Sequence, residues 1–160
     1  MSAVPEIRVR PMTAAEFGEW QEHSLTDYAI ELSDARGIPL DDARRLAAES
    51  HTRHLPQGQQ TPGVHLVIGE DSEGRPVGIL WVGPNPNGVG PAWVYDIEVD
   101  EDRRGEGWGR ALMLAAERLV RADGHEEIGL NVFGSNTVAR GLYESLGYQL
   151  SSMQMRKPLA

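Results

Sequence analysis

Apolar residues recur along the chain with two different periods, and these periods predict an alternation of strands and helices. Short runs rich in β-branched and aromatic residues predict six strands: Ile7 to Arg10, Val64 to Gly69, Pro76 to Val82, Ala92 to Val99, Leu130 to Phe133 and Gln149 to Met155. Apolar residues three or four positions apart predict four helices: Thr13 to about His23, Asp41 to about His54, Ala111 to Val120, and Asn136 to Gly147. The predicted order is therefore β, α, α, β, β, β, α, β, α, β.

The residues at the helix ends support these limits. Thr13 followed by Glu16 has the pattern of a capping box, and Asp41 and Asn136 are good N-cap residues. Gly147 suits the left-handed position that ends a helix. Three apolar residues of the last helix recur four positions apart and are expected to face the core: Val138, Leu142 and Leu146.

A glycine-rich loop joins the predicted strand at residues 92–99 to the predicted helix at 111–120. Three alternate glycines let its backbone turn tightly and bring N–H groups close to a ligand: Gly105, Gly107 and Gly109. The helix that follows directs its positive dipole end at the same place. Three arginines add charge that suits phosphate oxygens: Arg103, Arg104 and Arg110. The segment therefore predicts an anion site, with a pyrophosphate as the expected ligand.

Two common phosphate loops do not match this segment. A P-loop ends in Gly-Lys-Ser/Thr, whereas Gly109 is followed by Arg110 and Ala111, so no hydroxyl is present for magnesium. A dinucleotide-binding loop reads Gly-x-Gly-x-x-Gly near the start of a βαβ unit. Here the pattern is Arg-x-x-Gly-x-Gly, late in a short chain. Taken alone, the loop is explained equally well as a surface turn between strand and helix.

A second segment, residues 130–148, resolves this ambiguity. Its helix places Asn136, Ala139 and Tyr143 on one stripe, next to the apolar one, where they can face a ligand. The first loop resembles the acetyl-CoA-binding loop of the GCN5-related N-acetyltransferase (GNAT) superfamily. The second segment is similar to that family's other signature, Asn-x-x-Ala-x-x-Leu-Tyr-x-x-x-Gly-Phe/Tyr, and matches it at every position from Asn136 to Tyr148.

The resemblance implies an α+β fold, an α/β/α sandwich. Its mixed, mostly antiparallel central sheet is splayed at the fourth strand and flanked by helices. It also implies that acetyl-CoA is the acetyl donor. The backbone of Ile97 and Val99 would hold the acetyl carbonyl and the pantetheine arm. The remaining cofactor contacts would come from the glycine loop and the following signature: Arg104, Gly105, Glu106, Gly107, Trp108, Gly109, Arg110, Asn136, Ala139 and Tyr143.

The expected reaction is direct attack of a primary amine on the acetyl group. An alkylammonium has a pKa of about 10.4, so it must lose a proton first. Asp96 and Glu98 are alternate residues of one strand, share a face and are candidate bases. Alternatively, they are an edge pair that is solvated or bound to Arg103 and Arg140. By resemblance, Tyr143 is the general acid for the departing thiolate; the alternative is an amphipathic side chain at the helix edge.

Two other functions remain open. One is a protein lysine or N-terminal acetyltransferase. N-terminal acetyltransferases of the family commonly carry a glutamate on the fifth strand, and this chain has Asn131 there. The other is a non-catalytic acyl-CoA-binding module, against which Tyr143, Asp96 and Glu98 argue. The acceptor is expected to be a small amine or a peptide amine, with Tyr28, Glu31 and Asp34 as candidate contacts. The aromatic residues Trp81, Trp93 and Tyr95 are expected in the core or the acceptor-pocket wall.

Composition limits the remaining possibilities. At 160 residues the chain is expected to form a single domain, residues 1–160. It has no cysteine, and its histidines lack metal-site spacing, so no metal is expected. Fifteen basic against 24 acidic residues give a net charge of −9, which argues against nucleic-acid binding and is compatible with a cationic acceptor. With no membrane-length apolar run and no signal-peptide pattern, a cytoplasmic protein is expected. A homodimer is left open.

Overall fold

Five strands form one open, mixed sheet in the computed structural model, which describes residues 3–160. The first two residues of the expected domain lie outside the described part. The strands are β1 (Arg8–Pro11), β2 (His65–Glu70), β3 (Pro76–Gly83), β4 (Ala92–Val99) and β5 (Ile128–Leu130). They lie in chain order across the sheet, each antiparallel to the next except for the parallel pair of β4 and β5.

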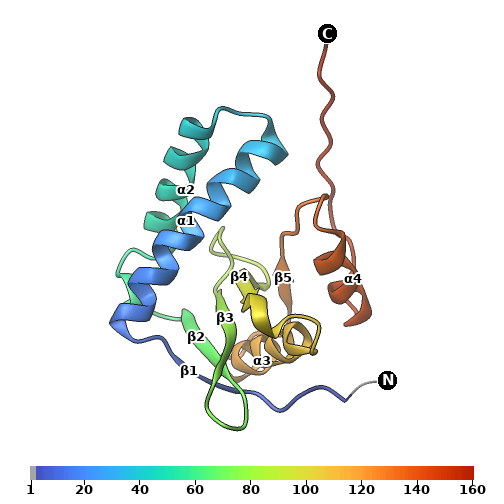
Figure 1. Ribbon diagram of the computed structural model, residues 1–160. Helices are drawn as coiled ribbons and strands as arrows, with labels where there is room; N and C mark the ends of the chain where they lie inside the picture. The colour runs from blue at the N-terminus through green and yellow to red at the C-terminus, as the bar shows by residue number, and fades with distance from the viewer. Residues whose placement is uncertain (1–2) are drawn as a thin grey trace.

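Four helices flank this sheet, and the expected α/β/α architecture is confirmed. They are α1 (Ala14–Arg36), α2 (Leu40–His54), α3 (Trp108–Ala122) and α4 (Thr137–Ser145), with short 3₁₀ turns at Gly58–Gln60 and Glu101–Arg103. Figure 1 shows α1 and α2 as a helical pair on one side of the sheet, with α4 beside β5. None of the helices in the described part is both long and apolar enough to cross a membrane.

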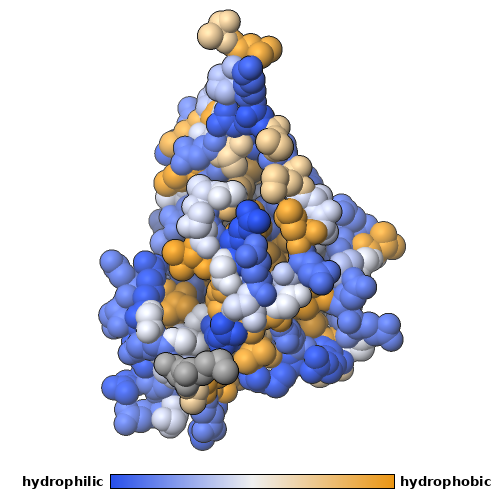
Figure 2. All heavy atoms as spheres, turned by 90° about the vertical axis from the view of Figure 1, so that its right-hand side faces the viewer, coloured by the Kyte–Doolittle hydropathy of each residue, from blue (hydrophilic) through white to orange (hydrophobic). Residues whose placement is uncertain are grey.

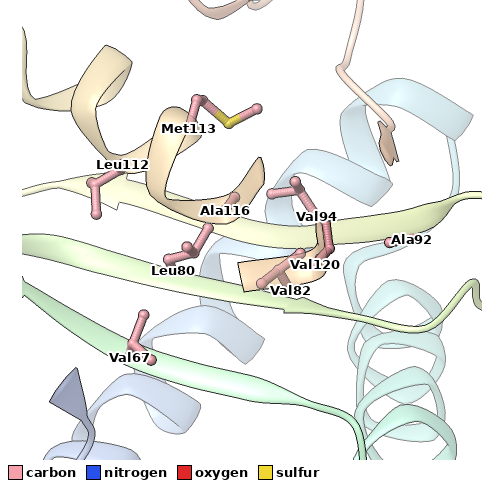
Figure 3. Packing of buried hydrophobic residues seen from close by; sticks show 9 residues of the cluster. All are labelled: Val67, Leu80, Val82, Ala92, Val94, Leu112, Met113, Ala116 and Val120. Carbon is pink, nitrogen blue, oxygen red and sulfur yellow. The ribbon is translucent and has the colours of Figure 1, made fainter. Parts of the chain in front are cut away.

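The main core lies between α3 and one face of the sheet. Alternate residues of the strands pack against residues of α3 in one cluster, which Figure 3 shows. The strand residues are Val67, Leu80, Val82, Ala92 and Val94, and the helix residues are Leu112, Met113, Ala116 and Val120. The other sheet face packs on the start of α1 through a second cluster, which contains Met12, Trp20, Leu66, Ile68 and Trp81. Asp96 and Glu98, the two candidate bases, lie on this second face.

Helix α1 is longer than its sequence pattern predicted. It begins after Thr13, whose capping box with Glu16 is confirmed, but it continues past His23 to Arg36. The second half stays helical because Ala29 and Leu32 are buried against small residues of α2, Ala43 and Ala47. Gly37, with a left-handed φ of 64°, ends the helix.

Helix α2 begins one residue before the predicted cap. Pro39 is its N-cap residue, and no side chain caps the helix. Asp41 lies inside the first turn, where its carboxylate accepts a hydrogen bond from Arg44 at 3.0 Å. The predicted cap is therefore two residues late, and Asp41 instead stabilises the helix from its first turn, through the helix dipole.

A β-bulge in β4 opens the sheet toward β5. Trp81 pairs with Asp96 while the next residue of β3, Val82, pairs with Val94, so Tyr95 is an extra residue in β4. Beside β5, β4 is paired only from Ala92 to Val94. The sheet is therefore splayed beyond that point, and in the described structure the residues of β4 after Val94 have no strand partner on the side toward β5.

The same splay shortens β5. A strand was predicted from residue 130 to 133, whereas β5 ends at Leu130. Residues 131–133 have no ladder partner because β4 has already diverged from them. In α4, Asn136 caps the helix and Gly147 is left-handed, as predicted. The prediction that Val138 is buried is wrong: its side chain is 88% exposed.

The predicted last strand, Gln149 to Met155, is also wrong in the described structure, where this tail forms no strand. Extended backbone counts as a strand only with a ladder partner, and the tail has none. It projects from the body instead, as Figures 1 and 2 show. Arg156 ties it to the end of α1, donating to the carbonyl oxygens of Asp34 and Ala35 at 2.9 and 3.0 Å.

Candidate active site

The bulge in β4 places two carboxylates toward α1. Asp96 and Glu98 contact α1, whereas Ile97 and Val99 pack with the core on the α3 side. The predicted shared face of the two acids is therefore present. Tyr95, the extra residue, also lies on the α1 side, where its ring stacks on that of Trp81 with centroids 4.6 Å apart.

Asp96 is held by the first helix. The indole Nε1 of Trp20 donates to its Oδ2 at 2.9 Å. Burial raises the pKa of Asp96 above its usual range; the hydrogen bond from Trp20 opposes this, and the nearby charge of Glu98 adds to it. Asp96 is thus a carboxylate with unusual basicity whose orientation is fixed by a buried tryptophan.

Glu98 has a different environment. Its Oε1 lies 3.3 Å from Nε2 of His23, and the same nitrogen lies 3.1 Å from Oδ2 of Asp27. The hydrogen bond to Glu98 raises the pKa of His23, with smaller contributions from the acids around it. These three residues also place potential metal-ligand atoms within 4.8 Å of one another. Neither Arg103 nor Arg140, the expected partners of an edge pair, forms an ion pair with these acids in residues 3–160.

The glycine loop fits a phosphate ligand. Gly105 and Gly107 have left-handed φ values of 77° and 91°, and Gly107 is the N-cap residue of α3. No side chain caps this helix in the described structure, so its first N–H groups are available to an anion. Gly109 lies where an added Cβ would come within 3.1 Å of Leu142, which lets α4 approach α3 closely.

The charged and aromatic side chains of the loop have distinct positions. Arg104 lines the pocket described below, and its Nε donates to the carbonyl oxygen of Val99 at 3.3 Å. Arg110 donates to the hydroxyl of Ser145 on α4 at 2.6 Å. Trp108 is buried and donates its indole N–H to Glu106. Any contact of Trp108 and Glu106 with a ligand would therefore use their backbone N–H groups.

Helix α4 contributes the second signature. The side chain of Asn136 accepts a hydrogen bond from the backbone N–H of Ala139 at 3.2 Å. Asn136 and Tyr143 both line the pocket. Burial raises the pKa of Tyr143, and the charge of Asp96 adds to the shift, so the phenol keeps its proton at neutral pH.

A pocket of about 530 Å³ lies between α1, α2, β4 and the segment from β5 to α4. Of the glycine loop, only Arg104 is among its lining residues. Both carboxylates, the phenol and Arg104 line it. Two of the three proposed acceptor contacts, Tyr28 and Glu31, also line it, whereas Asp34 does not. Trp81, Trp93 and Tyr95 form part of its wall, as does Asn131.

The acceptor side of the pocket is acidic. Four carboxylates line it: Asp27, Glu31, Asp96 and Glu98. Burial raises the pKa of Glu31, and the other three acids raise it further. The histidines on α2 do not offset this charge, because burial lowers the pKa of His54 and lowers that of His51 to about 4. Asp27 was not singled out from the sequence, since only the crossing of α1 over β4 brings it to the site. The spacing of His51 and His54 predicts a solvated helix end, and for His51 this is wrong, because its residue is 5% exposed.

Comparison with known proteins gives a consistent result. The profile of the acetyltransferase (GNAT) family matches residues 17–148. An N-acetyltransferase of Bacillus subtilis strain 168, YycN, is 32% identical over 154 residues, covering 96% of this chain and 99% of that protein. The crystal structure of YycN superposes with a TM-score of 0.87 over 97% of this chain and 99% of that one.

Two further proteins are more distant. Mycothiol acetyltransferase of Clavibacter sepedonicus is 29% identical over 140 residues, covering 79% of this chain but only 45% of that protein. The structure of AAC(6')-Iy with the bisubstrate analogue CoA-S-monomethyl-acetylneamine has a TM-score of 0.61 at 16% identity, over 97% of this chain and 99% of that one. At that identity the likeness shows the fold alone.

Proposed function

Because this chain belongs to the acetyltransferase (GNAT) family, we propose that it transfers the acetyl group of acetyl-CoA to a primary amine of a small cationic acceptor. The amine attacks the thioester directly while both substrates are bound. The observation that carries this proposal is the common pocket of Asp96, Tyr143 and the open side of β4. A donor bound along β4 would share this pocket with the base and the acid, so that proximity would contribute to the rate.

The donor would bind along β4, the glycine loop and α4. The backbone of Ile97 and Val99 would hold the acetyl carbonyl and the pantetheine amides, with the carbonyl oxygen of Val99 released from its hydrogen bond to Arg104. The pyrophosphate would be held by the loop at the start of α3, residues 104–110, and Asn136 and Ala139 would line its path. When bound, acetyl-CoA supplies an activated thioester carbonyl and a thiolate leaving group. A backbone N–H on the carbonyl oxygen would stabilise the charge that develops there.

Asp96 is the proposed general base. A carboxylate whose pKa is raised by burial is a stronger base than an exposed one. Trp20 donates to Oδ2 of Asp96, and Oδ1 is the proposed acceptor of the proton of the amine. Glu98, already bound by His23, would attract the cationic acceptor rather than accept its proton.

Tyr143 is the proposed general acid. Its phenol is protonated at neutral pH because burial raises its pKa. Donation of this proton would neutralise the departing thiolate. The non-catalytic alternative does not explain why a protonated phenol and a basic carboxylate line the same pocket.

The acceptor is proposed to be a small amine that carries further positive charge. The acid-lined end of the pocket has no lysine or arginine side chain among its lining residues other than Arg104. Asp27 and Glu31 would pair with a second ammonium group of the acceptor, and the ring of Tyr28 could contact it as well.

An acceptor screen tests this function. CoA release from acetyl-CoA is followed with 1,4-diaminobutane, butylamine and a lysine-containing peptide. The proposal predicts a higher kcat/KM for the diamine than for butylamine, and little turnover of the peptide. A preference for the peptide would favour the protein-modifying alternative. Binding of acetyl-CoA with no turnover of any amine would favour the non-catalytic one.

A further inference from the structure

Asp71 is a buried acid in the turn between β2 and β3, and it is not among the residues that line the proposed acceptor pocket. Its residue is 4% exposed. One oxygen accepts the backbone N–H groups of Glu73 and Arg75 at 2.9 and 3.0 Å. The other accepts from Nε of Arg75 at 3.2 Å and from Arg103 at 3.1 Å. Asp71 therefore links the hairpin turn to the segment that follows β4.

Arg103 continues this link into the glycine loop. Its side chain is 18% exposed. Besides Asp71, it donates to the carbonyl oxygen of Pro76 at 3.3 Å and to Glu106 at 3.4 Å. The guanidinium also lies over the ring of Trp108, 5.3 Å from its centroid. Glu106 in turn accepts the indole N–H of Trp108 at 3.1 Å.

These contacts hold a segment that has little conformational preference of its own. Gly105 and Gly107 flank Glu106, and glycine loses more conformational freedom on ordering than any other residue. A loop of this kind would have to be ordered by its ligand, at a cost in affinity, unless other contacts order it beforehand. Arg103 supplies such contacts just before the loop, and Glu106 supplies them within it.

We propose that Asp71 is a positioning residue for the glycine loop between β4 and α3. Acting through Arg103, it holds residues 104–108 in the conformation that binds the pyrophosphate. The inference rests on the proposed use of acetyl-CoA. In this proposal Arg103 does not contact the phosphate directly, because its guanidinium already donates to Asp71, Pro76 and Glu106.

Asp71 is well suited to this role. The hydrogen bond from the backbone of Arg75 is the main cause that lowers its pKa to about 2, with further contributions from Glu73 and Arg103. The carboxylate is consequently ionised at any pH used in an enzyme assay, so the link does not titrate. Any change on mutation would then reflect lost positioning rather than a shifted proton.

The test compares Asp71→Asn with Arg75→Ala. The amide keeps an acceptor for the turn but loses the charge that holds Arg103. Arg75→Ala removes the other cation bound to Asp71, one that has no contact with the loop. Binding of CoA is measured by calorimetry, and amide hydrogen exchange is measured for the peptide that covers residues 104–108.

The expected result is specific to Asp71→Asn. Its Kd for CoA rises roughly tenfold, as for the loss of one charged hydrogen bond, and residues 104–108 exchange faster. The kcat at saturating acetyl-CoA stays within about twofold, so the effect is on KM. Arg75→Ala behaves like the wild type in all three measurements.

Other outcomes are informative as well. Equal CoA affinity in Asp71→Asn and Arg75→Ala would overturn the inference while leaving the proposed function intact. A wild-type protein that does not bind CoA would instead contradict the proposed function. If Asp71→Asn fails to fold, Arg103→Gln makes the same test with the turn intact, and normal CoA binding by Arg103→Gln would refute the role of the link.

Discussion

Trp20 and Asp96 lie 76 positions apart in the chain, yet the indole N–H of the first donates to the carboxylate of the second at 2.9 Å. Trp20 is in the first half of α1, and Asp96 follows the bulge in β4. The contact ties the helix that covers the pocket to the strand that carries the candidate base. It also stabilises the ionised form of Asp96 against the effect of burial.

Removing this hydrogen bond is expected to change the pH dependence of catalysis. In Trp20→Phe the ring remains in the aromatic cluster, but the donor is lost. Because the bond lowers the pKa of Asp96, the acidic limb of kcat/KM should move to higher pH, by about one unit. Trp81→Phe is the matched control, since the indole nitrogen of Trp81 is buried without a hydrogen-bond partner. Equal profiles for the two variants would show that Trp20 does not act on the base.

The two strand acids are expected to differ in their kinetic roles. Asp96→Asn should lower kcat on the order of 10²-fold or more and abolish the acidic limb, because the proton acceptor is gone. Glu98→Gln should chiefly raise the KM of a cationic amine. Both substitutions are close to isosteric, so folding should be retained. Steady-state kinetics across pH check this, and the reverse pattern would assign the base to Glu98.

Local patterns predicted much of this molecule from the sequence. The capping box of Thr13, the N-cap at Asn136 and the left-handed Gly147 each depend on residues a few positions apart, and all three are confirmed. The glycine loop likewise has its strand before it and its helix after it. In these cases the residue types within a few positions determine how the backbone groups at a helix end are hydrogen-bonded.

Features that depend on distant neighbours were missed. The second half of α1 is held by α2, and the end of β5 depends on the bulge at Tyr95. Neither is visible in a window of a few residues. Arg103 is 32 positions from Asp71, and Asp96 is 76 positions from Trp20. These two contacts therefore appear only in the folded structure. The alternating tail after Gly147 has strand character but no partner strand in the described structure.

Acetyl-CoA binding is expected to require the left-handed conformation of Gly107. A valine there would be strained, since φ is 91°, and its Cβ would lie 3.1 Å from Pro5. CoA should raise the melting temperature of the wild type by mass action but not that of Gly107→Val. Gly124→Val is the control, because Gly124 has a similar φ of 93° with open space around it. It should lose stability yet keep the CoA-dependent shift.

The buried His51 is expected to make stability depend on pH. Its pKa is lowered from 6.5 to about 4 by burial, with a smaller contribution from His54. The unfolded chain therefore binds a proton in this range while the folded protein does not. The contribution of His51 to the free energy of unfolding should be fully present above about pH 6.5. It should be lost as the pH falls toward 4, which lowers the free energy of unfolding by about 3 kcal/mol. Chemical unfolding of wild type and His51→Gln across this range measures the difference. The control, His125→Gln, should retain the dependence.

The last prediction concerns the proton returned to the leaving thiolate. Tyr143→Phe removes only the phenolic hydroxyl and keeps the ring, which packs beside Tyr148 with centroids 6.0 Å apart. If Tyr143 is the general acid, kcat should fall on the order of 10²-fold while the Kd of acetyl-CoA stays nearly unchanged. Tyr148→Phe is the matched control: its hydroxyl contacts Glu117, away from the pocket, so turnover should be retained. Rapid-quench kinetics establish whether acetyl transfer limits the rate. An unchanged rate of that step in Tyr143→Phe would remove this residue from the mechanism and leave the thiolate to take its proton from water.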